Sequence, residues 1–520
     1  MLRILFGLIA TALATTAALA DRYSDCDQSR NVELRITACT EIIDRGKRES
    51  AAWRSRAYFQ RAWAYGQKQN HDQSIADYTA SIEINSKESL AYLNRGKAHH
   101  YKGDYEKARV DYSRAIEVDP KNADAYVNRA SILRTLGDKS GSLADYTKGL
   151  SLDPTSSYGY AGRAKLHHEL RDYDSALADY NKALELDPRN ADTVGNRGKI
   201  FYIRGDYDRA LAEYNKAIEL DANFADAYAN RASTYYVKKD YDKALTDYSK
   251  AIELDPNFAY AYANRGKIYY IRDDLDKAFS DYSKAIELQP GKAEDYVNRG
   301  KVYHKKREMD RALEEYSRGI ELDPNYADGY ANRASIYLDR KDYERSVSNY
   351  SKAIELDPKF VYAFANRGKV YHYQKEFDRA VSDYSKAIEL DPKDQENYSN
   401  RALSLMETGQ FDRAIADLSK LIEFDSQSAD AYRRRGEAYE KKGETAKAEA
   451  DFDKATQLET GGMGGKPAAE GKVETEKSPQ SEGSQRKERA PDIDLSPVAP
   501  EPRRLDERTM VKPPSGLALA

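Results

Sequence analysis

Scarce residue types narrow the functions that this chain can have. The 520 residues include only two cysteines, Cys26 and Cys39. Two cysteines without a histidine nearby cannot complete a zinc site, so a cysteine-based metal centre is not expected. The chain also lacks an excess of charge of one sign, because 83 basic residues stand against 87 acidic ones. A surface for nucleic acid or for an anionic membrane needs a clear basic excess. We therefore expect no nucleic-acid partner and no cofactor.

Long apolar runs are missing as well. The N-terminal run from Ile4 to Ala14 is shorter than the ~20 residues that a membrane-spanning helix needs. It follows Arg3 and precedes Ala18-Leu19-Ala20, which is the order of an export signal. We predict a signal peptide over residues 1–20, with an uncleaved anchor as the alternative. The mature chain would be exported, periplasmic or secreted, and would have no integral membrane span. In an oxidising compartment the two cysteines would pair.

The feature that the chain has in abundance is a repeat. An arginine recurs every 34 residues, without insertion or deletion. A fixed period of this length predicts stacked supersecondary units rather than separate globular domains. The recurrent arginines are Arg61, Arg95, Arg129, Arg163, Arg197, Arg231, Arg265, Arg299, Arg333, Arg367, Arg401 and Arg435.

Other positions of the 34-residue unit follow a helical pattern. We number the unit so that the arginine is position 7. Large residues, mostly tyrosine, stand at positions 4 and 11 with glycine or alanine at position 8, so they share one stripe of a helix. Positions 20, 24 and 27 repeat this arrangement of small and aromatic residues, and an Asp-Pro pair such as Asp119-Pro120 ends most units. Proline stops the preceding helix, and the aspartate either caps the following helix or closes the turn. Each unit should be helix, turn, helix and stop.

This spacing of aromatic, small and proline residues resembles the tetratricopeptide repeat family. The resemblance covers twelve units, or about 408 of 520 residues. It implies an all-α fold, a right-handed α-solenoid (superhelix) of helix-turn-helix units over residues 55–460. Residues 21–54 should form a helical cap, with one helix over 31–44 and a Cys26–Cys39 disulfide. Residues 461–520 contain no Phe, Trp or Tyr and hold eight of the sixteen prolines, so we expect a disordered tail.

The chain departs from the family at position 7, where an apolar residue, often leucine, is usual. Position 23 is acidic in eleven of the twelve units, and Asn349 is the exception. We predict a structural ladder in which each arginine pairs with the acid of the second helix, as in Arg231 with Asp247 and Arg265 with Asp281. Bidentate geometry is expected wherever the carboxylate allows it.

The resemblance also implies a concave groove, lined by positions 2, 5, 6, 9, 12 and 13 of the first helices. Position 6 is asparagine in nine units, and a row of side-chain amides can grip an extended peptide through donors and acceptors. The alternative is that asparagine is simply the common family residue at this position. Lysines at position 9, among them Lys199, Lys267 and Lys301, are further candidates for binding a partner. The asparagines are Asn94, Asn128, Asn196, Asn230, Asn264, Asn298, Asn332, Asn366 and Asn400.

A longer period of three repeats lies within the shorter one. Tyr158, Tyr260 and Tyr362 at position 2 are spaced by 102 residues, which indicates growth by copying blocks of three repeats. Histidines at position 12, such as His100 and His168, lie at least two repeats apart, too far for a shared metal site. We expect these histidines to be solvated.

No nucleophile, base and orienting group can be recognised together in the sequence, so an enzyme is not expected. The function that the sequence favours is a non-catalytic scaffold that holds a protein or peptide in the groove. The alternatives are a component of cell-envelope biogenesis that acts through the convex face or the tail, and a solenoid whose tyrosines stack on carbohydrate. The partner and the oligomeric state stay open.

Overall fold

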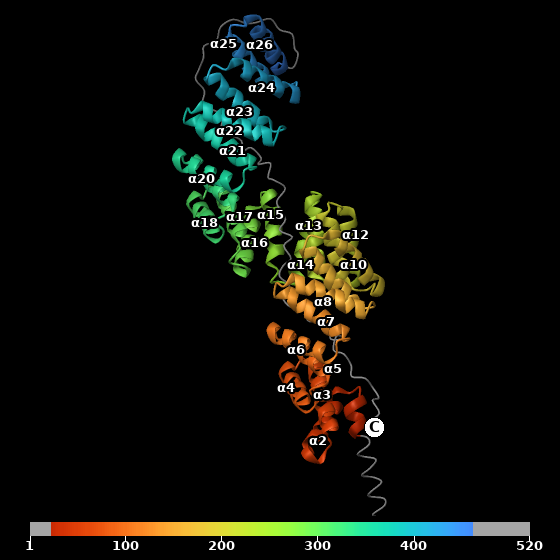
Figure 1. The fold of residues 1–520 in the computed structure, drawn as a ribbon. Helices are drawn as coiled ribbons and strands as arrows, with labels where there is room; N and C mark the ends of the chain where they lie inside the picture. The colour runs from red at the N-terminus through yellow and green to blue at the C-terminus, as the bar shows by residue number, and fades with distance from the viewer. Residues whose placement is uncertain (1–21, 461–520) are drawn as a thin grey trace, which may run out of the picture. The chain divides into compact units, whose positions relative to one another are not determined.

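The computed structural model describes residues 22–460, and these residues form α-helices and one short 3-10 helix without a strand. The predicted signal peptide, residues 1–20, and the predicted tail, residues 461–520, lie outside the described residues. The described chain falls into two compact units, residues 22–234 and residues 235–460, which meet within α13 (Ala225–Val237). In each unit consecutive helices pack against one another in chain order (Figure 1). The predicted all-helical solenoid is confirmed.

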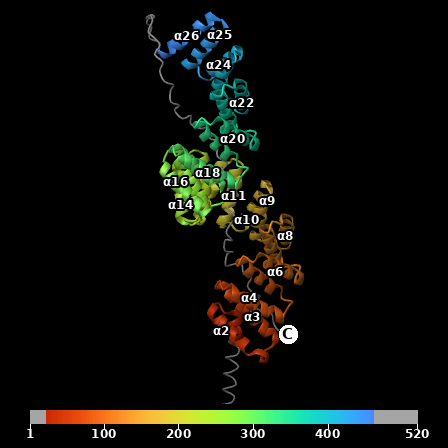
Figure 2. The ribbon, with the colours of Figure 1, turned by 90° about the vertical axis from the view of Figure 1, so that its left-hand side faces the viewer.

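The first unit begins with a cap and continues with helix pairs, in which the first helix has 13 residues, except for 17 in the first pair, and the second helix has 14. The turned view of Figure 2 shows the same succession of neighbouring helices. The cap consists of a helix over residues 22–28, α2 (Val32–Asp44) and the 3-10 helix η1 (Gly46–Arg48). The pairs are α3 (Ala51–Gln67) with α4 (His71–Ile84), α5 (Ser89–Tyr101) with α6 (Tyr105–Val118), α7 (Ala123–Thr135) with α8 (Lys139–Leu152), α9 (Ser157–Glu169) with α10 (Tyr173–Leu186), and α11 (Ala191–Ile203) with α12 (Tyr207–Leu220).

The second unit continues the same alternation of a 13- or 14-residue first helix and a 14- or 15-residue second helix. It begins with the last residues of α13, which are followed by α14 (Tyr241–Leu254). The remaining pairs are α15 (Ala259–Ile271) with α16 (Leu275–Leu288), α17 (Ala293–Lys305) with α18 (Met309–Leu322), α19 (Ala327–Asp339) with α20 (Tyr343–Leu356), α21 (Val361–Tyr373) with α22 (Phe377–Leu390), α23 (Gln395–Glu407) with α24 (Phe411–Phe424), and α25 (Ala429–Lys442) with α26 (Thr445–Glu459).

Short polar residues set the ends of these helices. Position 16 supplies the N-cap of the second helix, as in Asp172, whose carboxylate accepts a hydrogen bond from the Ser175 amide. This satisfies one of the amides that a helix start leaves without a partner. The sequence allowed the aspartate of the Asp-Pro pair either to cap the following helix or to close the turn, and the structure shows the second role. The Asp119 carboxylate accepts a hydrogen bond from the Lys121 amide at 3.0 Å, so it closes the turn and leaves the N-cap of α7 to Asn122.

A tyrosine at position 24 forms the centre of most repeats. Ten of these tyrosines, from Tyr78 to Tyr384, are nearly or fully buried. Within each unit such rings pack against position 8 of their own first helix, as Tyr112 does at Gly96, which explains why that position is small. A Cβ added at Gly300 would lie 2.6 Å from the Tyr316 ring, whereas at Gly266 the corresponding distance to Tyr282 is 3.2 Å. The repeats therefore differ in how much room the ring leaves.

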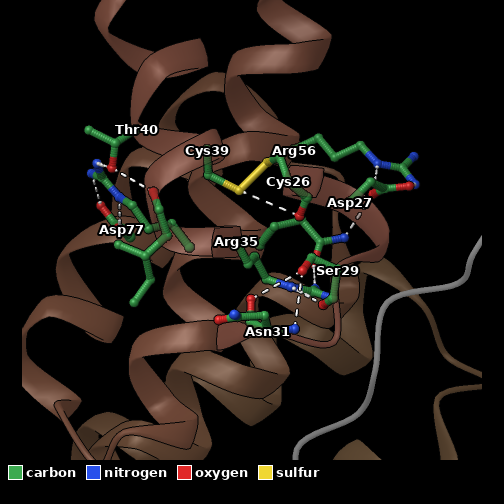
Figure 3. Close-up of a disulfide and its surroundings, with 12 residues drawn as sticks. Cys26, Asp27, Ser29, Asn31, Arg35, Cys39, Thr40, Arg56 and Asp77 are labelled. Atoms are coloured by element: carbon green, nitrogen blue, oxygen red, sulfur yellow. Dashed lines mark hydrogen bonds and ion pairs between the residues drawn. A yellow bond between two sulfur atoms is a disulfide. The ribbon is translucent and has the colours of Figure 1, made fainter. Parts of the chain in front are cut away.

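The N-terminal cap is covalently closed. A disulfide joins Cys26, in the helix over residues 22–28, to Cys39 in α2, and both residues are fully buried with Ile42 and Ala57 (Figure 3). The Asn31 side chain caps α2 through the amides of the second and third helical residues. The cap thus extends the apolar core beyond the first repeat.

Candidate functional site

The first helices of the repeats form a continuous inner row in each unit. Neighbouring first helices contact one another, as in α5 with α7 and α7 with α9 in the first unit, or α17 with α19 and α19 with α21 in the second. The described second helices show no comparable contact with one another. Because first helices approach more closely than second helices, the stack curves locally with the first helices inside. The candidate binding surface is this inner row.

The recurrent arginine ties its inner helix to two neighbouring helices. Arg265 donates from Nε and Nη2 to the two carboxylate oxygens of Asp281, each at 2.8 Å. Its Nη1 donates to the Ser249 hydroxyl on the second helix of the preceding repeat at 3.1 Å. Its guanidinium also lies 5.6 Å from the centre of the Tyr262 ring, one turn earlier on the same helix, within cation–π range. One side chain thus joins both helices of its own repeat to the repeat before it.

The same arrangement recurs in both units with little variation. The closest arginine–carboxylate distances are 2.6–2.8 Å for position 23 acids. Arg333 instead donates a single bond, 2.9 Å, to the amide oxygen of Asn349. Arg231 and Asp247 belong to different units, and their pairing stays a prediction. The position 25 acceptors of Nη1 are Thr79, Ser113, Asn181, Asn215, Ser249, Ser283, Ser317, Ser351, Ser385 and Ser419.

The asparagine row lies on the inner helices but is largely covered. The side chains of Asn128, Asn196, Asn264, Asn332 and Asn366 donate to the backbone carbonyl four residues earlier, at 2.6–2.9 Å. Asn94, Asn128, Asn230, Asn264, Asn298 and Asn332 are 0–9 % exposed, and Asn196, Asn366 and Asn400 are half-buried. A partner would therefore meet mainly the last three. Peptide binding by the row stays a prediction.

Two lysines of position 9 pair with the acid at position 2 of the following repeat. Lys267 lies 2.6 Å from Glu294, and Lys165 lies 2.7 Å from Asp192. Burial would raise the pKa of the Glu294 carboxyl, but Lys267, helped by Lys292 and Lys301, holds this pKa below its ordinary value. Burial lowers the pKa of Lys97 to about 8, although Asp124 acts against this. Charges on the inner row are thus neutralised along the row itself.

Serine replaces lysine at position 9 wherever tyrosine follows at position 2. The Ser335 hydroxyl lies 2.8 Å from the Tyr362 hydroxyl of the next repeat and 2.9 Å from the Tyr350 hydroxyl of its own second helix. Burial raises the pKa values of Tyr146 and Tyr158, and a hydrogen bond between each hydroxyl and the Ser131 side chain acts against this. The 102-residue period is therefore a period of matched inter-repeat pairs, in which Lys meets an acid and Ser meets Tyr.

The histidines of position 12 are half-buried rather than fully solvated, which corrects the expectation from the sequence. Burial, together with the nearby Arg134, lowers the pKa of His100 to about 4, and burial also lowers the pKa of His168. His372 lies 2.9 Å from the Ser404 hydroxyl, and His304 lies 2.9 Å from Asp339, both in the following repeat. These imidazoles fill the space between neighbouring inner helices, and helical spacing alone did not reveal how close those helices come.

Two further tests apply to the part of the chain that the structure describes. No group of three or more His, Cys, Asp or Glu side chains within residues 22–460 is arranged to hold a metal ion. Within the same range no helix combines the length and the apolar character that a bilayer crossing requires.

Sequence reasoning missed two features of the inner row. One is the bond from arginine to position 25, and the signal was present, because that position is Ser, Thr or Asn in eleven repeats. The other is the pairing of positions 9 and 2, whose signal is the joint change from Lys and acid to Ser and Tyr. Both features join successive repeats, so a search within a single unit could not find them.

Comparison with known families identifies the repeat. Four family models match, three described as "Tetratricopeptide repeat" and one as "TPR repeat". Together the matches cover residues 55–460 apart from gaps at 89–95, 191–197 and 327–333. The matched segments are 157–190, 225–258 and 361–394; 96–137, 198–239, 266–306, 334–375 and 403–443; 248–279 and 384–416; and 55–88, 123–156, 294–326 and 429–460.

Solved structures give distant likenesses. The crystal structure of the APC/C hetero-tetramer Cut9-Hcn1 is 15 % identical, with 78 % of this chain and 93 % of that chain covered and a TM-score of 0.45. Yeast Tom70 is 18 % identical over 79 % and 97 %, with a TM-score of 0.36. YrrB, described as a TPR protein with an unusual peptide-binding site, is 26 % identical over 35 % and 95 %, with a TM-score of 0.31. No protein with a curated description matches the sequence.

Proposed function

Because this chain belongs to the tetratricopeptide repeat family, we propose that it is a non-catalytic scaffold which binds an extended polypeptide on its inner row. The observation that carries the proposal is the neutralised inner row. Lys165 and Lys267 at position 9 are already paired with the position 2 acids Asp192 and Glu294, so a partner is not selected there by one sign of charge. Half-buried amides at Asn196, Asn366 and Asn400 remain between these pairs and suit a polar backbone.

We also propose that the chain acts outside the cytoplasm. The N-terminal residues have the order of an export signal, and two neighbouring cysteines are linked in the fold. Disulfides persist in oxidising compartments. N-terminal sequencing of the protein purified from its native cell tests this proposal, and the expected first residue is Asp21. A chain that still begins at Met1 and fractionates with the cytoplasm would refute it.

Site-specific photo-cross-linking tests the binding surface. A photoreactive amino acid is placed at Ile271 or Tyr373, which are exposed on first helices, and at Val110, which is exposed on a second helix. We expect the same polypeptide to cross-link from Ile271 and Tyr373 but not from Val110. The Asn366→Ala, Asn400→Ala variant should weaken the cross-link from Tyr373.

One cross-linking pattern would contradict binding on the inner row. Cross-linking from Val110 alone would move the function to the second helices, as in the envelope-assembly alternative. Circular dichroism on each variant serves as the folding control, because loss of helix would reduce all cross-links together.

A further inference from the structure

The first repeat departs from the others at three inner positions. Position 2 is Arg56, position 6 is Gln60 and position 9 is Trp63, where later repeats mostly have an acid or tyrosine, an asparagine, and a lysine or serine. All three side chains contact the N-terminal cap. These three residues therefore differ because they contact the cap, and not because the first repeat has lost its pattern.

The part of the cap that lies against the first repeat presents the carboxylate of Asp27 and the backbone carbonyl of Ser29. Asp27 accepts two hydrogen bonds of 2.5 Å from the Arg56 guanidinium, and a third of 2.9 Å from the Gln60 amide (Figure 3). The Gln60 amide oxygen accepts from Arg35 at 2.5 Å. Arg35 also donates to the Ser29 carbonyl, and its guanidinium lies 4.6 Å from the centre of the Trp63 ring. Arg35 is 1 % exposed, so the contact is closed to solvent.

Helix α2 occupies the place of a second helix from a preceding repeat. Its Thr40 hydroxyl accepts from Arg61 Nη1 at 3.0 Å, as position 25 does in later repeats. Its Glu33 lies 2.5 Å from Lys68, as Asp174 does from Arg204. Counting from Thr40 puts Cys39 at position 24, where most repeats have the buried tyrosine. The row of second helices is thus extended, and the disulfide takes the place of an aromatic core.

On the inner side, by contrast, residues 26–31 lie over the first repeat and are tethered by Cys26. We propose that residues 26–31 are a built-in occupant which closes the N-terminal end of the inner row, and that the vacated surface takes an acidic polypeptide segment. The proposal rests on the proposed function in one respect only, that a polypeptide binds the inner row.

The chemistry of the vacated surface follows from the groups that Asp27 now satisfies. A guanidinium that makes two parallel bonds to a carboxylate is strong and geometrically selective. Without Asp27, Arg56 and Arg35 would lie together with one fewer acid, and a carboxylate from a partner would replace it. In later repeats the inner lysines Lys165 and Lys267 already have an acid of their own, Asp192 and Glu294.

The chain carries its own probe for this contact. Its two tryptophans, Trp53 and Trp63, both lie here, since the Trp53 ring is 4.5 Å from that of Tyr23 and Trp63 stacks on Arg35. Tryptophan fluorescence of the full-length protein therefore reports on the cap alone. We expect a change in emission for Asp27→Ala and for Cys26→Ser, Cys39→Ser, with circular dichroism unchanged.

Peptide binding then tests the proposed partner chemistry. One labelled peptide carries residues 24–31 with serine for Cys26, and the matched peptide has asparagine for Asp27 as well. The double cysteine variant should bind the first peptide about tenfold or more tightly than the second, and wild type should bind neither. Asp27→Ala, with the disulfide intact, is the second variant.

Three results would overturn the proposal: unchanged tryptophan emission in both variants, equal affinity of a variant for the two peptides, or binding by wild type as tight as by the variants. None of them depends on cross-linking at Ile271 and Tyr373. The closed end and the proposed function therefore fail separately.

Discussion

Removing one acid from the arginine ladder should destabilise the repeat around it far more than removing the asparagine that replaces the acid in one repeat. The perturbation is Asp281→Ala. Asp281 is 5 % exposed and accepts two bonds from Arg265. The variant leaves a guanidinium, 18 % exposed, with the Ser249 hydroxyl and the Tyr262 and Tyr269 rings. The matched control is Asn349→Ala, which removes one bond to Arg333.

The two losses differ in kind. Breaking a buried ion pair from one side costs ~3–5 kcal/mol because a charge is stranded, and access of water to Arg265 places the loss near 3 kcal/mol. The Asn349 bond is a single hydrogen bond to a charged donor, and its loss costs roughly 1.5 kcal/mol. The expected difference is about 1.5 kcal/mol, or roughly tenfold in an opening constant.

Hydrogen exchange resolves such a local difference, because a repeat array does not unfold in one step. Amides of α16 in Asp281→Ala should exchange on the order of 100-fold faster than in wild type, against roughly tenfold faster for amides of α20 in Asn349→Ala. The double variant Arg265→Leu, Asp281→Leu should recover much of the loss, since no charge is then stranded. Equal exchange in the two single variants would refute the view that the ladder holds the repeats together.

Three further predictions concern the inner row and the core. The fold disfavours the protonated form of His100, because the pKa of His100 is about 4 in the fold against an ordinary 6.5. The stability that the neutral imidazole contributes to the fold is therefore lost as pH falls from 6.5 to 4. Urea unfolding should show that His100→Gln removes on the order of 2 kcal/mol of this pH dependence, and an unchanged dependence would contradict it. Gly300→Ala should destabilise by ~1 kcal/mol because Tyr316 must shift, whereas Gly266→Ala should be neutral or stabilising by up to ~1 kcal/mol; thermal melts that rank the two the other way would contradict the packing argument. The buried disulfide should resist dithiothreitol in the native protein and react after urea is added, as mass spectrometry of alkylated thiols would reveal, and rapid native reduction would show that the cap opens readily.

Regular repetition made the fold predictable, because the period fixed where each helix begins and ends. The sequence showed that position 8 is small, and the structure supplies the reason, because a tyrosine ring of the second helix packs on it. The site was harder to predict. The family pattern placed the asparagines on the inner helices, but it could not show that most are covered, since burial depends on how closely neighbouring first helices approach. The same closeness explains His100 and His168, which were expected to be solvated.

The matched pairs along the inner row restrict how the chain can be shortened. Deleting residues 293–326 would bring Lys267 opposite Asp328 and preserve a cation facing an acid. Deleting residues 361–394 would bring Ser335 opposite Glu396, and Ser335 would lose its hydrogen bond with the hydroxyl of Tyr362, which the deletion removes. A deletion of 102 residues keeps every junction of this kind. Repeats can therefore be deleted from this protein only in certain combinations. The residues at positions 9 and 2 indicate which deletions leave two neighbouring repeats whose facing side chains still match.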